Sequence, residues 1–183
     1  ERFWVAVGRT RSNKYVIVAA GSAVTSELRY ADAADPDAEF QTVWPRRDGI
    51  EYSIDHAVVG GEDRFLILHN DGAVNFTLVD APVSDPTAVR TLIPHRDDVR
   101  LDAVDAFDGH LVVSYRADAL PRIQLWPVSD TGYGEASDIR FDSELMSVGL
   151  SANPNWSAPK MRIGATSFVT PVRIYDLDLS TGE

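Results

Sequence analysis

A repeat of nearly fifty residues is the feature of this sequence that most restricts how it can fold. Four strand-like segments can be aligned, and they begin at Leu28, Phe76, Ile123 and Val172. Their starting positions differ by 48, 47 and 49 residues. A Pro-x-Arg-Asp motif follows the same spacing, at residues 45–48 and 94–97. Self-similarity of this kind is typical of folds that stack one supersecondary unit several times.

Each unit predicts four short antiparallel strands. Residues 15–20, 64–69 and 110–115 are rich in β-branched and aromatic side chains and are bounded by Gly, Asn or Asp. Hairpin turns are predicted at residues 60–63 and 70–72, because Gly and Asn tolerate positive φ angles. Helical periodicity does not persist over three turns in any segment. The sequence therefore predicts an all-β fold, a β-propeller fragment of about four four-stranded blades.

The blade boundaries follow from the same repeat. Each aligned segment is preceded by a predicted strand pair, at residues 3–20, 52–68, 101–115 and, less clearly, 146–168. A fourth strand is predicted at residues 40–44, 89–93 and 137–141. The blades are thus expected at about residues 1–48, 49–97, 98–144 and 145–183, the last without its fourth strand.

Composition excludes several classes of protein. The 183 residues are 44% hydrophobic but contain no apolar run near eighteen residues, which predicts a globular domain and no membrane partner. With 17 basic and 28 acidic residues the net charge is -11. A negative field disfavours nucleic acid as a partner and favours cationic peptides. The alternative is that the acidic surface only keeps the protein soluble. The lack of cysteine excludes disulfides and thiolate sites and favours a cytoplasmic location. Because the sequence opens at Glu1 without a signal pattern, we expect a segment of a longer protein.

The repeated Pro-x-Arg-Asp motif is expected at the crossover from an outer strand to the next blade's inner strand. Proline ends the outer strand because it cannot donate to the ladder. The loops between second and third strands, at residues 21–27, 70–74 and 116–122, should emerge on the same rim. The charges there either pair with each other, as Arg47 with Asp48, or form a polar docking face for another domain. The candidate interdomain residues are Glu27, Arg46, Arg47, Asp48, His95, Arg96, Asp97 and Arg122.

Five spaced motifs connect the chain to a known family. They are AVTSE at residues 23–27, LRYADA at 28–33, WPRR at 44–47, EYSIDH at 51–56 and TSFVTP at 166–171. Together they resemble the propeller of the oligopeptidase B (protease II) group, in the prolyl oligopeptidase family of serine peptidases. The resemblance implies a seven-bladed propeller that caps a separate α/β-hydrolase domain and keeps large folded proteins out. It further implies cleavage of short peptides after Arg or Lys, short basic peptides as partners, and no cofactor.

The sequence predicts no catalytic residue within these 183 positions. The nucleophile elbow Gly-x-Ser-x-Gly is missing, and the nearest candidates, around Ser151 and Ser167, lack the closing glycine. Peptidase activity would therefore belong to the full-length protein, and the substrate-binding residues stay unidentified. Two other functions are considered: a protein-binding propeller scaffold, and a propeller glycoside hydrolase. The latter needs a carboxylate pair at a defined separation, which the sequence does not specify.

The remaining polar and aromatic candidates have structural explanations. No metal-ligand pattern joins the histidines, which we expect to be satisfied structural or surface imidazoles: His56, His69, His95 and His110. Core packing is expected for Trp4, Trp126 and Trp156. The carboxylates on predicted inner strands either line a central tunnel, where they would favour basic peptides, or form ordinary polar faces: Glu51, Asp55, Asp102 and Asp105.

An incomplete ring has a further consequence. Four blades cannot close a ring of seven, so the first and last blades should each expose an apolar sheet face. We expect the fragment to self-associate through those faces or to curl and bury them.

Overall fold

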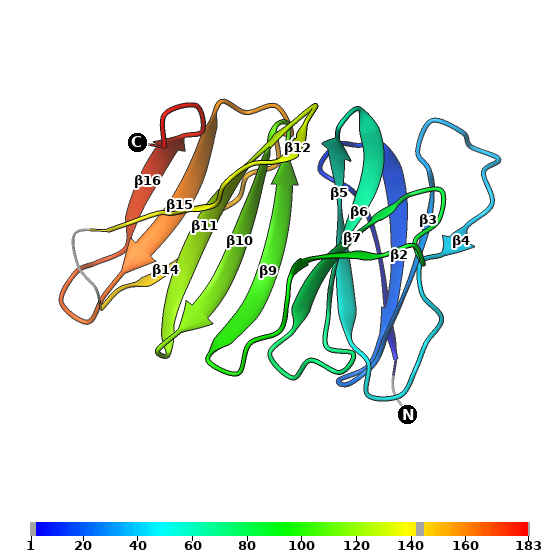
Figure 1. Ribbon diagram of the computed structural model, residues 1–183, viewed down its shortest axis with the longest axis horizontal. Coiled ribbons are helices and arrows are strands. Elements are labelled where there is room, and N and C mark those ends of the chain that lie inside the picture. The colour runs from blue at the N-terminus through cyan, green and yellow to red at the C-terminus, as the bar shows by residue number, and fades with distance from the viewer. Residues whose placement is uncertain (1–2, 142–144, 183) are drawn as a thin grey trace.

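The computed structural model describes residues 3–141 and 145–182, and over these residues it contains strands, turns and loops. Four antiparallel sheets stand side by side, each built from consecutive segments of the chain (Figure 1). The prediction of an all-β propeller fragment is confirmed. We call the sheets blades 1 to 4 in chain order. No helix in the described part of the chain has the length and apolarity needed to cross a membrane.

Blade 1 contains β1 (Trp4–Arg9), β2 (Tyr15–Gly21), β3 (Ser26–Asp32) and β4 (Gln41–Thr42), in that order across the sheet. Every residue of β1 is exposed, because no described blade covers its outward face. The expectation that Trp4 packs in the core is therefore wrong, since its side chain is 58% exposed.

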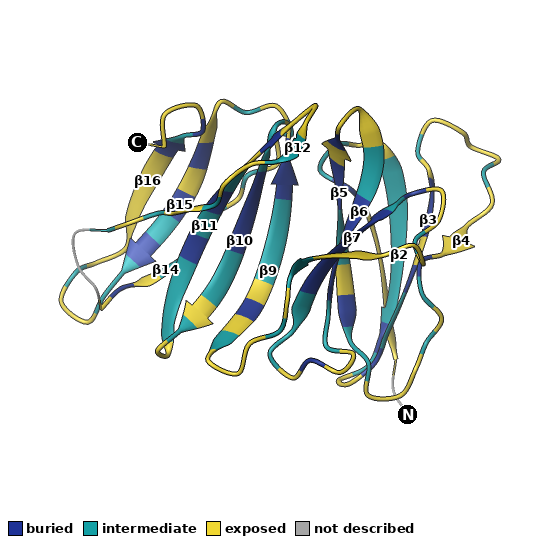
Figure 2. Ribbon diagram, in the orientation of Figure 1, coloured by how far each residue is buried: buried dark blue, intermediate teal, exposed yellow. Residues whose placement is uncertain are grey.

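Blade 2 contains β5 (Tyr52–Val59), β6 (Glu62–His69), β7 (Thr77–Pro82) and β8 (Arg90–Ile93). The β5–β6 hairpin turns through Gly60 and Gly61, whose φ angles are 62° and 76°. Two positive φ angles define the type I′ turn, which matches the twist of the flanking strands. Blades lie on both sides of blade 2, and most of β6 and β7 is buried (Figure 2).

Blade 3 contains β9 (Val99–Phe107), β10 (His110–Ala117), β11 (Leu120–Ser129), β12 (Gly132–Tyr133) and β13 (Ser137–Asp138). Its outer strand is split, because β12 and β13 both pair with β11.

The loop predicted between the second and third strands of blade 3 is wrong in extent. Strand β10 continues to Ala117 and β11 begins at Leu120, so only Asp118 and Ala119 form the turn. Their φ angles of 52° and 62° again correspond to a two-residue type I′ hairpin. Arg116 and Arg122 consequently belong to strands and not to a loop.

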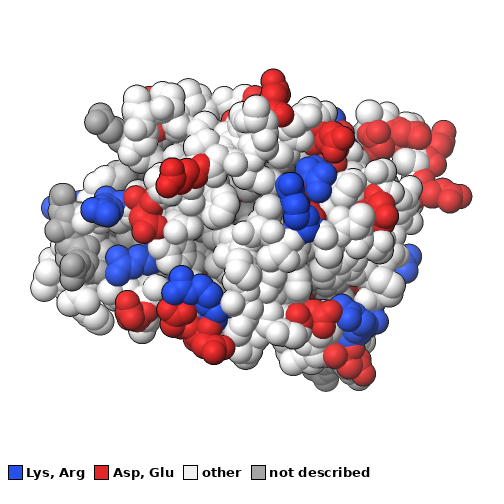
Figure 3. Space-filling view, viewed as in Figure 1, with Lys and Arg blue, Asp and Glu red and all other residues white. Residues whose placement is uncertain are grey.

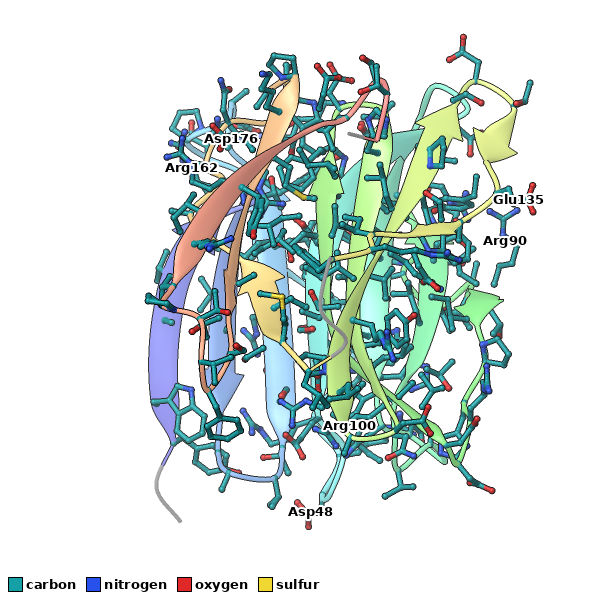
Figure 4. The ribbon with its side chains drawn as sticks, turned by 90° about the vertical axis from the view of Figure 1, so that its left-hand side faces the viewer. Asp48, Arg90, Arg100, Glu135, Arg162 and Asp176 are labelled. Carbon is teal, nitrogen blue, oxygen red and sulfur yellow. The ribbon has the colours of Figure 1, made fainter. Side chains whose placement is uncertain are left out.

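Within the described residues blade 4 has three strands, β14 (Ser147–Leu150), β15 (Lys160–Thr166) and β16 (Arg173–Asp178). Exposed and buried residues alternate along β15, and one face of β16 is uncovered (Figure 2). Val172 and Ile174 are exposed on this blade. The side chains of Arg162 and Asp176 pair on its surface at 2.9 Å (Figure 4).

The core consists of three clusters, one at each interface between adjacent blades. Between blades 1 and 2, Tyr30 and Tyr15 approach the fully buried Phe65 edge to face, with ring centroids 4.8 Å and 5.6 Å from it. Burial of a side chain of this size contributes roughly 2 kcal/mol. The blades are therefore held face to face by apolar packing, and this fixes the loops at either end of the strands.

Candidate functional site

The alternating direction of the strands produces two rims. The crossover rim, at the bottom of Figure 1, carries the crossovers between blades and the turns between second and third strands. The opposite rim carries the turns between first and second strands. The crossover rim comprises residues 22–25, 43–51, 70–76, 94–98, 118–119 and 167–172, and the opposite rim comprises residues 10–14, 60–61, 108–109 and 151–159.

Arg46 points into blade 1 and not toward a partner. Its Nη1 donates to Thr25 Oγ1 at 2.9 Å and its Nη2 to the carbonyl oxygen of Ala20 at 2.8 Å. Its backbone N–H donates to Glu27 Oε2 at 3.2 Å, and its guanidinium lies 4.3 Å from the centroid of the Phe3 ring. Arg46 and Glu27 are thus brought together, and both stabilise the first crossover.

Arg47 pairs with Asp71, at 2.6 Å, and not with Asp48 as the sequence suggested. The reason is that the β6–β7 turn of blade 2 lies against this crossover. Asn70 in that turn accepts the N–H of Glu51 at 2.8 Å and donates to Gly49 O at 3.2 Å. Asp48 is left exposed at the tip of the crossover (Figure 4).

The second crossover is held by the same turn of blade 2. Asn75 Nδ2 donates to the carbonyl oxygens of Arg96 and Asp97, at 3.0 Å and 2.9 Å. Arg96 pairs with Asp98 at 2.6 Å on the surface, whereas the Asp97 side chain is fully exposed and 3.9 Å from His95 Nδ1. Among the described residues, no hydrogen-bond partner reaches the buried Nε2 of His95.

The third blade supplies the remaining charges of this rim. Asp102 pairs with Arg100 at 3.3 Å and with Arg116 at 2.9 Å. Arg122 is half-buried opposite Tyr115 in the β10–β11 ladder. The eight predicted interdomain residues are therefore distributed along the rim of three blades and do not converge on one centre.

Exposed apolar side chains on the crossover rim were missed by the sequence reasoning. Val24 and Val74, at the turns of blades 1 and 2, are 54% and 75% exposed. Phe168 and Val169, at the β15–β16 turn, are almost completely exposed, and Leu145, shortly before β14, is also exposed. The signal was present, because an apolar residue recurs at the same turn in three of the four blades.

On the opposite rim, Arg11 contacts three other blades. Its Nη2 pairs with Asp105 at 2.6 Å and its Nη1 with Asp55 at 3.4 Å. Nη1 also donates to Ala106 O, and Nε donates to Asn153 O, both at 2.8 Å. Two of the carboxylates expected to line a tunnel are therefore paired with the same guanidinium.

The pKa of the Asp55 carboxyl group, which pairs with Arg11, is raised in the folded protein. Its side chain is 15% exposed, and burial raises its pKa to about 6. Hydrogen bonds from the N–H groups of Ala106 and His56, both at 2.8 Å, and the Arg11 charge limit this rise in pKa.

His56 lies in a hydrogen-bonded chain between blades 1 and 2. Its Nδ1 is 2.8 Å from Ser12 Oγ and its Nε2 is 3.0 Å from Asp63 Oδ1, while Asp63 also pairs with Lys14 at 2.5 Å. Burial lowers the pKa of His56. The residue types match a Ser-His-Asp relay, but His56 has no exposed surface, so a substrate cannot reach it. His56 is therefore a satisfied buried imidazole.

His69 and His110 are half-buried, and two of the tryptophans lie at a packed interface. In the part of the chain that the structure describes, the buried Nδ1 atoms of His69 and His110 have no hydrogen-bond partner. Trp126 and Trp156 pack, half-buried, against the core between blades 2 and 3. Within the described residues no group of three metal-binding side chains gathers.

Acidic side chains are conspicuous at the end of the molecule formed by blade 1 (Figure 3). A groove of about 990 Å³ lies between blades 1 and 2. Four carboxylates line it, from Asp32, Glu39, Glu62 and Asp63. This distribution places negative charge beside the opposite rim and on the outer surface.

Comparison with known proteins matches the chain over its whole length. The family model "prolyl oligopeptidase, N-terminal beta-propeller domain" matches residues 1–183. Dipeptidyl aminopeptidase BI of Pseudoxanthomonas mexicana is 34% identical over 186 residues, which cover 100% of this chain and 24% of that protein. Protease 2 of Moraxella lacunata is 31% identical over 183 residues, covering 100% of this chain and 25% of that protein.

A solved structure gives the same result. Oligopeptidase B from Trypanosoma brucei, in a closed form with covalently bound antipain, superposes with a TM-score of 0.90 and 29% identity, covering 99% of this chain and 26% of that one. The chain therefore spans about a quarter of the length of these relatives. The resemblance inferred from the five motifs is confirmed. From its match over residues 1–183 and its stacked four-blade architecture, this chain belongs to the prolyl oligopeptidase family and is part of the family's N-terminal β-propeller domain.

Proposed function

We propose that this propeller segment is the non-catalytic gating part of a serine oligopeptidase that cleaves short peptides after Arg or Lys. The observation that carries the proposal is the similarity to oligopeptidase B over 99% of the chain at a TM-score of 0.90. The 31% identity to Protease 2 supports the same activity class. Since the chain spans about a quarter of these relatives, the catalytic machinery would lie in a separate α/β-hydrolase domain.

The charge of the propeller supports a preference for basic peptides. With a net charge of -11, the domain creates a negative potential that attracts cations over a distance of about 10 Å at moderate salt. The inner-strand carboxylates contribute less than their positions suggest, because Asp55 and Asp105 are paired with Arg11. The attraction would therefore come from the overall field and would weaken at high ionic strength.

The crossover rim is the face that we propose to dock on the hydrolase domain. Arg46 and Arg47 bind Thr25 and Asp71 within the propeller, so their main role is to stabilise the rim and not to contact another domain. The exposed groups of this rim include Asp48, Asp97 and the apolar tips at Val74 and Phe168. An apolar centre with a polar periphery is the usual composition of a stable domain contact.

The proposal is tested with the full-length protein and chromogenic peptides that differ only at the residue before the cleaved bond. Arg and Lys substrates should give kcat/KM values at least about 100-fold above that of an Ala substrate. Equal values for all three would contradict the basic specificity. A full-length protein without peptidase activity would instead favour a protein-binding scaffold.

The docking face is tested by Phe168→Ser combined with Val169→Ser in the full-length protein. Loss of these tips should loosen the domain contact and increase amide exchange of the crossover rim, while the matched Val89→Ser, in the connection that precedes β8, should not. Unchanged exchange in the double variant would contradict docking through this rim.

A further inference from the structure

The loop between β14 and β15, residues 151–159, leaves blade 4 and crosses the opposite rim toward blades 3 and 2 (Figure 1). Its Trp156 carbonyl accepts the N–H of Asp108, in the β9–β10 turn of blade 3, at 3.0 Å. The Trp156 indole stacks on His56 of blade 2, with ring centroids 6.1 Å apart. One loop of blade 4 thus contacts two other blades.

Arg11 connects blade 1 to the same loop. Its Nε donates to Asn153 O at 2.8 Å, while its two terminal nitrogens contact Asp55 of blade 2 and Asp105 of blade 3. The guanidinium also covers the Phe107 ring at 4.3 Å from the centroid. A planar guanidinium with five N–H donors can satisfy acceptors in several directions at once, which the point charge of lysine cannot.

The loop is built to hold this shape. Asn153 Nδ2 donates to the carbonyl oxygens of Ser151 and Arg162, and Asn153 Oδ1 accepts the Arg162 N–H at 2.7 Å. At the other end, Leu179 N–H donates to Pro159 O at 3.0 Å. Both ends of the loop are therefore fastened to blade 4, and its middle is fastened to the other blades.

We infer that residues 151–159 form a strap which, clamped by Arg11, locks the inner ends of the four blades together and narrows the axial opening at the opposite rim. Arg9, Asp55 and strap residues 152–154 line an open groove of about 560 Å³ beside the clamp. The clamp is the element that determines whether this groove can widen. If the propeller gates a peptidase, as proposed above, the strap excludes larger polypeptides from this end of the propeller.

The strap itself is tested by amide hydrogen exchange on the full-length protein, without any activity assay. The Asp108 N–H is the reporter, because it donates to the Trp156 carbonyl. Arg11→Met should accelerate its exchange at least about tenfold, and Arg11→Lys should have a smaller effect. The matched control is Arg9→Met, since Arg9 is exposed, lines the same groove and makes none of the clamp contacts. Equal Asp108 exchange in Arg11→Met and Arg9→Met would overturn the strap.

The gating role depends on the proposed peptidase activity and has a separate readout. In Arg11→Met, cleavage of a peptide of about thirty residues should increase at least about threefold relative to a chromogenic dipeptide, whose kcat/KM should not change. Faster Asp108 exchange with an unchanged ratio of long-peptide to dipeptide cleavage would refute the gating role but would still support the strap. A wild-type protein that cleaves neither substrate would refute the peptidase proposal and the gate, whereas the exchange result would still decide the strap.

Discussion

The indole of Trp156 stacks on the imidazole of His56 at an interplanar angle of 29°, although the two residues belong to blades 4 and 2. The same imidazole bonds Ser12 of blade 1 through Nδ1. His56 therefore connects three blades, and its ring is fully buried. A buried polar side chain in this position determines how the blades sit against one another, because both of its nitrogens require partners.

Replacing His56 with alanine should lower the free energy of unfolding by about 3 kcal/mol. The variant leaves a cavity beneath Trp156 and removes a hydrogen-bond partner from Ser12 and from Asp63. Urea unfolding followed by intrinsic fluorescence measures the loss. His110→Ala is the control, since His110 is half-buried and its Nδ1 has no partner within residues 3–141 and 145–182, so its loss should be less than half as large. Equal losses would show that the His56 network contributes nothing special.

The raised pKa of Asp55 predicts an unusual pH dependence. The fold favours the protonated carboxyl, so between about pH 4 and pH 6 the folded state binds more protons than the unfolded state. The stabilisation that Asp55 contributes is complete below the pKa of this carboxyl group in the unfolded chain, and it is lost as pH rises through about 6. The shift corresponds to at most about 3 kcal/mol.

His56 opposes this trend, because its lowered pKa makes stability fall as pH drops below 6.5. The Asp55 contribution is therefore measured as a difference between wild type and Asp55→Asn. The unfolding free energy of wild type minus that of Asp55→Asn should decrease from pH 4 to pH 6.5. Asp176→Asn is the control, because its Arg162 partner lowers the pKa of Asp176 and confines its effect to lower pH. Parallel curves for wild type and Asp55→Asn would contradict the raised pKa.

Asp80 holds a buried charge cluster between blades 2 and 3. Its carboxylate is fully buried and accepts hydrogen bonds from Arg64, Arg90 and Tyr133. Asp80→Ala should destabilise the fold by about 3 kcal/mol, because Arg64 would keep its charge in a site that is only 14% exposed. Asp98→Ala removes the partner of Arg96 at the surface and should cause no measurable change in the urea midpoint. A loss no larger for Asp80→Ala than for Asp98→Ala would refute the cluster's role.

The repeat predicted the fold because backbone propensity and turn chemistry are local. The fourth strands predicted at residues 40–44 and 89–93 correspond to β4 and β8, and Gly60-Gly61 forms the predicted hairpin. The loop at residues 116–122 was predicted too long, because Asp118 and Ala119 adopt positive φ without a glycine to signal it. Trp4 was misassigned because its burial depends on a neighbouring sheet and not on its own strand.

The long-range polar contacts could not be predicted, because residues distant in sequence supply them. Pairing Arg47 with Asp48 follows from proximity along the chain, but the blade 2 turn brings Asp71 closer. Arg11 gave no signal at all, since its partners lie in three other blades. The repeat predicts that the blades stack. It does not predict which charged residues pair at the ends of the blades, because this depends on the exact conformation of the turns.

The two outer blades present apolar faces that predict self-association of this chain when it is produced alone. Val7 on β1 is 71% exposed, and Val172 and Ile174 are exposed on blade 4. Burial of such faces releases roughly 25 cal/mol per Å², which favours contact between copies. Sedimentation velocity should therefore show a weight-average mass that rises with concentration, together with binding of a hydrophobic dye. Val7→Lys should reduce both signals, whereas Val89→Lys, at the residue immediately before β8, should leave them unchanged. A chain that stays monomeric at high concentration and binds no dye would contradict this prediction.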